Sequence, residues 1–257
     1  EMCIRDRDRE GTVKKYYFSN QESCKEFKTY LGESFKLEAN IRSEEVKDWN
    51  TEWRKSYSTI SVDGEFDIIP EWEKDNHTAS PRNIFIYPGQ GFGTGSHETT
   101  FLCMKLYLEN MTKNKTVKTC LDFGCGSGIL GLAALKLNNS LKLDLYDIDP
   151  AAIENSQQNI ELNDFGDSAI ELLLPSDREK IGKKYDLVFA NILQNVLLLE
   201  KKYLSSALNP GGNLILSGLL NGQEDIVIKE YLAANNNLTH VETLQKGDWV
   251  AILFELK

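Results

Sequence analysis

From residue 83 onward, segments typical of buried strands alternate with segments typical of amphipathic helices. Strand patterns lie at 119–124, 142–149, 169–174, 185–193 and 211–220, and helix patterns lie between them at 127–137, 151–163 and 194–208. This alternation predicts parallel strands with right-handed helical crossovers on both faces of one sheet. After a helix at 223–234, two last strands at 238–244 and 248–256 are separated by a short turn. Such a turn joins antiparallel neighbours, so we expect the last strand to run against the others in a seven-stranded α/β sheet.

The residues before this alternation are organised differently. A strand at 13–18, a helix at 21–31 and a strand at 35–41 form half of a small α+β unit, which is too little to bury a core alone. Residues 1–7, EMCIRDR, resemble a translated sequencing adapter, so we expect a non-native segment there. We therefore predict a partial α+β domain at 8–48, a linker at 49–82 whose tryptophans seal an interdomain joint, and the α/β domain at 83–257.

Composition limits the class of protein and its partners. With 41% apolar and 26% charged residues, the chain resembles soluble globular proteins, and no apolar run approaches the ~20 residues of a membrane span. We therefore expect a cytoplasmic monomer that does not enter membranes. Five cysteines without a CxxC pair and three scattered histidines make a metal site a poor expectation. The net charge of −10 argues against direct nucleic-acid binding and favours a basic protein partner.

A glycine-rich loop, FGCGSG, follows the first strand of the alternation. Its glycines, Gly124, Gly126 and Gly128, permit a tight turn, and the next helix offers free backbone N–H groups. The following strand ends in Asp147, whose carboxylate is placed to accept hydrogen bonds from both hydroxyls of a ribose. Ligands of open α/β sheets bind beyond this end of the strands. The pair therefore predicts a cofactor that carries a nucleoside.

The glycine spacing separates two cofactor classes. Nicotinamide enzymes favour GxGxxG, which accommodates a pyrophosphate, whereas this loop reads GxGxG and follows Asp122. An acidic residue there would repel a diphosphate, but it would attract the amino group and sulfonium of S-adenosylmethionine. We therefore predict S-adenosylmethionine as the cofactor and keep a nicotinamide oxidoreductase as the weaker alternative.

Asn191 ends the fourth strand and should point into the same crevice. A lysine amine must lose its proton before methylation, which costs roughly 4 kcal/mol at neutral pH, whereas an α-amine costs about 1 kcal/mol. The amide oxygen of Asn191 could accept a hydrogen bond from the neutral amine and orient its lone pair. Asn191 is therefore the candidate catalytic residue. Cys125 has no histidine beside it in sequence, so we interpret it as a small loop residue and not as a nucleophile.

Several of these segments resemble one enzyme family, the ribosomal protein L11 methyltransferases (PrmA family). The matching segments are FGTGSHETT, LDFGCGSGIL, DIDPAAIENSQQN, FANIL, GGNLILSG and GDWVAI, and DWNTEW resembles the family's interdomain linker. The resemblance covers residues 48–257, and FGTGSHETT is its most specific part. It implies a class I methyltransferase (Rossmann-like) fold, with residues 8–48 as a truncated domain for substrate recognition.

The resemblance also implies an activity and a set of contacts. The family trimethylates amino groups of a basic large-subunit ribosomal protein with S-adenosylmethionine, at lysine side chains or the N-terminal amine. Its cofactor contacts fall on Thr100, Gly124, Asp147 and Asn191. Within GQGFGTGSHETTF, residues 89–101, we expect FGTG to form a flexible flap over the cofactor, while Thr100 touches the cofactor from above. Lysine methylation of another protein, RNA methylation by the same fold, and a binding module without catalysis remain the alternatives.

Overall fold

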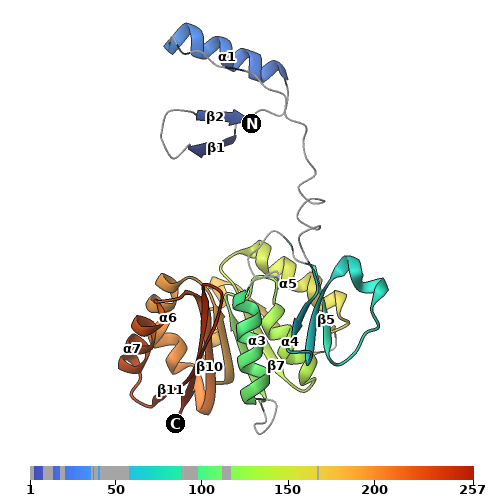
Figure 1. Ribbon diagram of the computed structural model, residues 1–257, viewed down its shortest axis with the longest axis vertical. Helices are drawn as coiled ribbons and strands as arrows, with labels where there is room; N and C mark the ends of the chain where they lie inside the picture. The colour runs from blue at the N-terminus through green and yellow to red at the C-terminus, as the bar shows by residue number, and fades with distance from the viewer. Residues whose placement is uncertain are drawn as a thin grey trace. The chain divides into compact units, whose positions relative to one another are not determined.

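The computed structural model describes residues 3–7, 14–17, 21–35, 37, 40, 58–87, 89, 98–111, 117–166 and 168–257 (Figure 1). The chain divides into two compact units, Glu1–Arg54 and Lys55–Lys257. The predicted interdomain tryptophans, Trp49 and Trp53, and the predicted flap at 92–95 lie outside the described residues.

The first unit contains a strand pair and one helix. Strand β1 (Cys3–Arg7) pairs antiparallel with β2 (Lys14–Tyr17), and helix α1 (Gln21–Phe35) follows. The seven residues that we set aside as non-native thus include a strand, and their origin stays a prediction. The strand predicted at 35–41 is wrong at its start, because Phe35 ends α1, and neither Leu37 nor Asn40 is in a strand.

The second unit begins with a small sheet in the order β3–β4–β5. Strand β3 (Ile60–Val62) runs antiparallel to β4 (Phe66–Pro70), and β5 (Asn83–Ile86) runs parallel to β4 after the short helix η1 (Glu71–Asn76). Val62, Phe66 and Ile68 are fully buried in the core of this unit. The predicted linker at 49–82 is therefore too long, since it contains β3, β4 and η1.

The main sheet has seven strands in the order β11–β12–β10–β9–β6–β7–β8. Strand β12 runs antiparallel to both of its neighbours and so against the other six strands, as predicted from the short final turn. The strands are β6 (Thr119–Phe123), β7 (Lys142–Tyr146), β8 (Ile170–Leu173), β9 (Tyr185–Asn191), β10 (Leu208–Leu220), β11 (Leu238–Lys246) and β12 (Trp249–Leu256).

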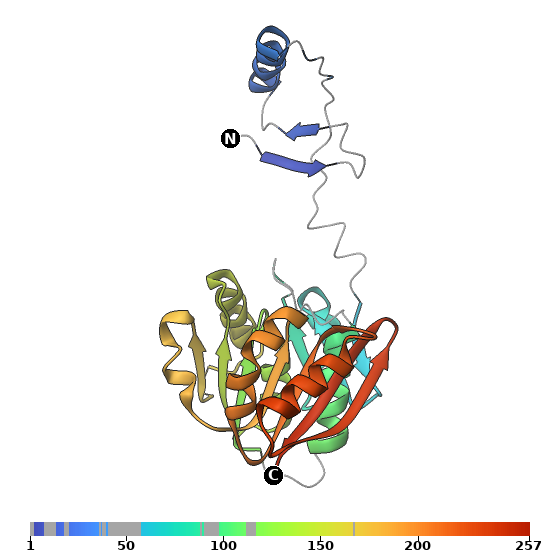
Figure 2. The ribbon, with the colours of Figure 1, turned by 90° about the vertical axis from the view of Figure 1, so that its left-hand side faces the viewer.

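Helices cover both faces of the main sheet (Figures 1 and 2). On one face lie α3 (Glu98–Met111), α4 (Ile129–Leu137) and α5 (Pro150–Leu162); on the other lie α6 (Gln194–Ser206) and α7 (Glu224–Ala234). Helix α5 starts where it does because Asp149 caps it by accepting a hydrogen bond from Ala151 N at 2.9 Å, and Pro150 fits the first helical position.

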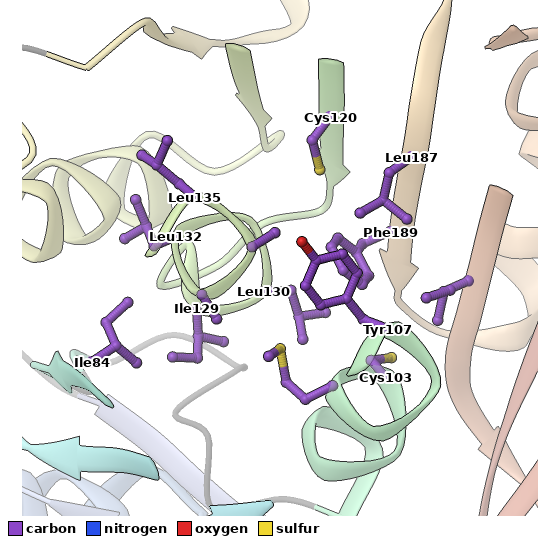
Figure 3. Close-up of a cluster of buried hydrophobic side chains, with 14 of the residues drawn as sticks. Ile84, Cys103, Tyr107, Cys120, Ile129, Leu130, Leu132, Leu135, Leu187 and Phe189 are labelled. Carbon is purple, nitrogen blue, oxygen red and sulfur yellow. The ribbon is translucent and has the colours of Figure 1, made fainter. Parts of the chain in front are cut away.

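Each face has its own apolar cluster. Figure 3 shows part of the cluster under α3 and α4, where the ring of Tyr107 meets Phe189 of β9 edge to face, with ring centres 5.9 Å apart. Phe189 is fully buried, and burial of one such side chain contributes about 1.5–3 kcal/mol. This packing fixes α3 against β9 and so sets the positions of the residues at their ends.

Candidate functional site

The candidate site lies at the carboxyl ends of β6, β7 and β9. From β6 the chain continues to β7 and β8 on one side, while β9 and β10 add to the other side. The strand order therefore reverses between β6 and β9, which is where open α/β sheets bind ligands.

The loop Gly124–Gly128, here called the cofactor loop, turns from β6 into α4. All three of its glycines have positive φ, and the backbone N–H groups of Gly124 and Cys125 both donate to Tyr146 O, at 2.8 and 3.0 Å. A Cβ atom on Gly124 would lie 2.4 Å from Ile192 Cγ2, so the residue after Asn191 packs directly on the loop. Glycine is thus required here both for backbone conformation and for space.

Asp147 follows β7 and is half-buried beside the cofactor loop. Its Oδ2 accepts a hydrogen bond from Gly126 N at 2.9 Å, and its Oδ1 accepts one from Asp149 N at 3.0 Å. Two backbone donors therefore fix the carboxylate. Each oxygen has a second lone pair that can accept from a ligand hydroxyl.

Asp122 lies beneath the loop and is almost fully buried. Its Oδ2 accepts a hydrogen bond from Gly131 N at 2.9 Å, in the first turn of α4, so the carboxylate caps the helix. Burial raises the pKa of Asp122 to about 7; the nearby Asp147 adds to this, and the hydrogen bond from Gly131 opposes it. The predicted attraction of Asp122 for the cofactor's amino group stays a prediction.

We expect Asp122→Asn to remove a pH-dependent loss of stability. The pKa of Asp122 rises from 3.8 to about 7 on folding, so between these values the folded protein binds the proton more tightly than the unfolded chain. The contribution of this proton to the free energy of unfolding is complete below pH 3.8 and disappears as the pH rises through 7. The free energy of unfolding therefore falls by about 2–3 kcal/mol between pH 5 and 8. Asparagine can still accept from Gly131 N and stays neutral. Urea unfolding at pH 5 and 8 measures the difference between wild type and variant; an equal difference at both pH values would contradict the prediction.

Asn191 ends β9, pairs in register with Ser217 of β10, and is partly exposed at the same edge. Its Nδ2 donates to Thr99 Oγ1 of α3 at 3.1 Å. The next residue, Ile192, is held by Gly218, where a Cβ atom would lie 2.3 Å from Ile192 O. The amide of Asn191 is thus fixed on one side by α3, and its oxygen is the atom that can accept from an amine.

Thr100, the predicted cofactor contact of α3, is fully buried, and its Oγ1 has no hydrogen-bond partner among the described residues. It is the neighbouring Thr99 that contacts Asn191. The sequence HETT does not indicate which threonine faces β9, because this depends on the rotation of α3. Sequence reasoning therefore missed Thr99, along with Ile192 and Gly218.

Cys125 is buried inside the loop, and its Sγ lies 3.6 Å from Ser156 Oγ. Burial raises the pKa of this thiol well above its usual range, and the nearby Asp122 adds to the effect. A thiol held in its neutral form is a poor nucleophile, which supports the interpretation of Cys125 as a small loop residue.

Metal binding and membrane spans can also be considered for the described part of the chain. No group of three or more His, Cys, Asp or Glu side chains there is arranged to hold a metal ion. No helix there is long and apolar enough to cross a membrane.

Comparison with known proteins places this arrangement in a family. The sequence model of the family "Ribosomal protein L11 methyltransferase (PrmA)" matches residues 5–257. A ribosomal protein L11 methyltransferase of Bacillus cereus is 33% identical, with 95% of this chain and 80% of that protein covered, and one of Bacillus anthracis is equally similar. The crystal structure of a ribosomal protein L11 methylase from Lactobacillus delbrueckii subsp. bulgaricus is 32% identical with a TM-score of 0.67, covering 78% of this chain and all of the other. The chain therefore belongs to the ribosomal protein L11 methyltransferase (PrmA) family, and its second unit has the class I methyltransferase fold of an enzyme.

Proposed function

We propose that this protein transfers methyl groups from S-adenosylmethionine to amino groups of ribosomal protein L11, at lysine side chains, the N-terminal amine, or both. The observation that carries the proposal is the carboxylate of Asp147. Gly126 N and Asp149 N hold it at the point where the strand order reverses. Family membership supplies the reaction class and the substrate class.

The residues at the site fit S-adenosylmethionine. Asp147 would accept from the ribose hydroxyls, and the glycines of the cofactor loop allow close approach of the backbone. Thr100 of α3 is a candidate contact for the cofactor. Its buried hydroxyl has no hydrogen-bond partner among the described residues, which is unfavourable, and a polar group of the ligand would provide one. When bound, S-adenosylmethionine supplies an electrophilic methyl group on a sulfonium.

The chain's own contribution to the chemistry is to orient the amine. Thr99 engages the amide nitrogen of Asn191, which leaves the amide oxygen to accept a hydrogen bond from the incoming amine. A neutral amine can donate one hydrogen to this oxygen and keep its lone pair directed at the methyl group, whereas an ammonium has no lone pair to offer. An ammonium can donate to the same oxygen, so the role of Asn191 is to align the neutral amine once its proton has left.

Charge supports the choice of a protein substrate. The chain carries a net charge of −10, which attracts a basic protein and repels a phosphate backbone. We therefore propose a basic ribosomal protein as the partner, no direct contact with nucleic acid, and action as a monomer in the cytoplasm, where ribosomal proteins are available.

One labelling experiment tests this function against its alternatives. The protein is incubated with methyl-labelled S-adenosylmethionine and, separately, with ribosomal protein L11, an unrelated lysine-rich protein and ribosomal RNA. We expect label on ribosomal protein L11 and at most trace label on the others. Label on RNA alone would establish the RNA methyltransferase alternative, and label on the unrelated protein alone would point to a different lysine substrate.

A further inference from the structure

Helix α5 and its C-cap residue carry asparagines at every fourth position, and these bind the edge of strand β5 and its continuation to Tyr87. The first of them, Asn155, donates to Tyr87 O at 3.2 Å, and the next two each make a pair of bonds. Asn163 accepts from Phe85 N at 2.8 Å and donates to Phe85 O at 2.7 Å. One turn earlier, Asn159 accepts from Tyr87 N at 2.7 Å and donates to Tyr87 O at 3.1 Å. Strand β5 is an edge strand of the small sheet, and this edge pairs with no other strand in the described part of the chain. The two amides therefore take the place of a neighbouring strand.

The two amides differ in where their second N–H points. The Nδ2 of Asn163 also donates to Asn159 O, at 2.8 Å, so its bonds stay within α5 and β5. The Nδ2 of Asn159 instead donates to Ser127 O at 2.9 Å, inside the cofactor loop. Asn159 is fully buried, and both N–H groups and the oxygen of its amide make hydrogen bonds, to Tyr87 and to Ser127. A single side chain thus joins the small sheet, α5 and the cofactor loop.

A second contact from α5 reaches the same loop. Ser156 Oγ, also fully buried, donates to Gly126 O at 3.0 Å. Gly126 is the residue whose N–H holds the carboxylate of Asp147. Helix α5 therefore fixes two consecutive peptide groups of the loop from below, one through Ser156 and one through Asn159.

We infer that Asn159 is a positioning residue for cofactor binding, which holds the cofactor loop in register with Asp147 from α5. The inference rests on the proposed use of this loop for S-adenosylmethionine. Loss of the Asn159 amide removes its hydrogen bond to Ser127 O and lets the loop relax away from Asp147, although Asn159 touches neither the cofactor nor the methyl acceptor. Asn163 binds β5 in the same way, but its amide makes its other bond to Asn159 O and not to the loop.

The matched variants Asn159→Ala and Asn163→Ala separate positioning from stability. Each removes one buried amide, from α5 or from its C-cap, and two bonds to β5 or its continuation, so we expect similar decreases in Tm. The dissociation constant of S-adenosylmethionine, measured by calorimetry well below both Tm values, should rise about tenfold for Asn159→Ala and less than twofold for Asn163→Ala. At saturating cofactor, kcat should change little in either variant.

A milder variant keeps the test decisive if Asn159→Ala does not fold. Ser156→Ala removes only the bond to Gly126 O and a weak contact to Cys125, so it should fold and weaken S-adenosylmethionine binding about threefold. If wild type binds the cofactor and Asn159→Ala binds it equally well, or Ser156→Ala does so where Asn159→Ala does not fold, the positioning role is excluded while the proposed function stands. If wild type itself does not bind S-adenosylmethionine, the proposed function fails instead.

Discussion

Gly218→Ala is expected to reduce the free energy of unfolding by about 3–5 kcal/mol. Gly218 lies in β10 at φ +83°, and a Cβ atom there would lie 2.3 Å from Ile192 O, 2.8 Å from Ile192 C and 3.0 Å from Ile192 N. These are backbone atoms, which cannot rotate away as the end of a side chain can. The variant therefore combines a backbone conformation unfavourable for alanine with steric overlap, each worth about 1–3 kcal/mol. Urea unfolding measures the loss.

Gly211→Ala is the matched control for this prediction. Gly211 lies in the same strand at φ +76°, but a Cβ atom there would have no heavy atom within 4 Å. Its replacement should therefore show only the conformational penalty, about 1 kcal/mol. Equal losses for the two variants would mean that overlap with Ile192 is not what requires glycine at 218.

The contact between Gly218 and Ile192 also bears on the site. Ile192 N donates to Ser217 O at 3.2 Å, and a Cβ on Gly124 would meet Ile192 Cγ2. Ile192 thus lies between β10 and the cofactor loop, directly after Asn191. Any shift of this residue moves Asn191 as well, so Gly218→Ala should lose activity even under conditions where it is fully folded.

The main sheet could be predicted from sequence because its strands are buried on both faces. Val188 and Phe189 are adjacent and both fully buried, on opposite faces of the sheet, which gives the continuous apolar run that marks a parallel strand. Asp147 and Asn191 could be selected because each is a polar residue at the carboxyl end of a predicted strand. The structure brings both to one edge, as the parallel arrangement requires.

Other features depend on partners far away in the chain. Strand β3 is only three residues long, so its pattern is too short to distinguish it from a linker, and its place in the core comes from packing with β4. The spacing of Asn159 and Asn163 is visible in the sequence, but nothing near them indicates Tyr87, which is 72 positions away from Asn159. The contact between Thr99 and Asn191 likewise spans 92 positions. Local patterns predict elements, whereas such side-chain bonds follow only from how the elements pack.

Asp147→Ala is expected to weaken S-adenosylmethionine binding about 30- to 100-fold. The carboxylate makes charge-assisted hydrogen bonds, which are worth about 1.5–3 kcal/mol each, and alanine offers the ribose hydroxyls no acceptor. The variant also releases Gly126 N, so part of the loss comes from the cofactor loop. Calorimetric titration of the folded variant with S-adenosylmethionine measures the effect.

Asp149→Ala, two residues away, provides the control that separates binding from stability. Asp149 is exposed, and its Oδ1 caps α5 by accepting from Ala151 N at 2.9 Å, so its removal should cost about 1 kcal/mol of stability. The hydrogen bond from the Asp149 backbone N–H to the Asp147 carboxylate remains in this variant. The dissociation constant of the cofactor should therefore stay within about twofold of wild type. Comparable losses of affinity for S-adenosylmethionine in the two variants would contradict the prediction. They would mean that binding depends on the negative charge of the segment between β7 and α5 and not on the position of Asp147. Because both aspartates are acidic and lie two residues apart between β7 and α5, only the fixed direction of the Asp147 carboxylate predicts that they differ.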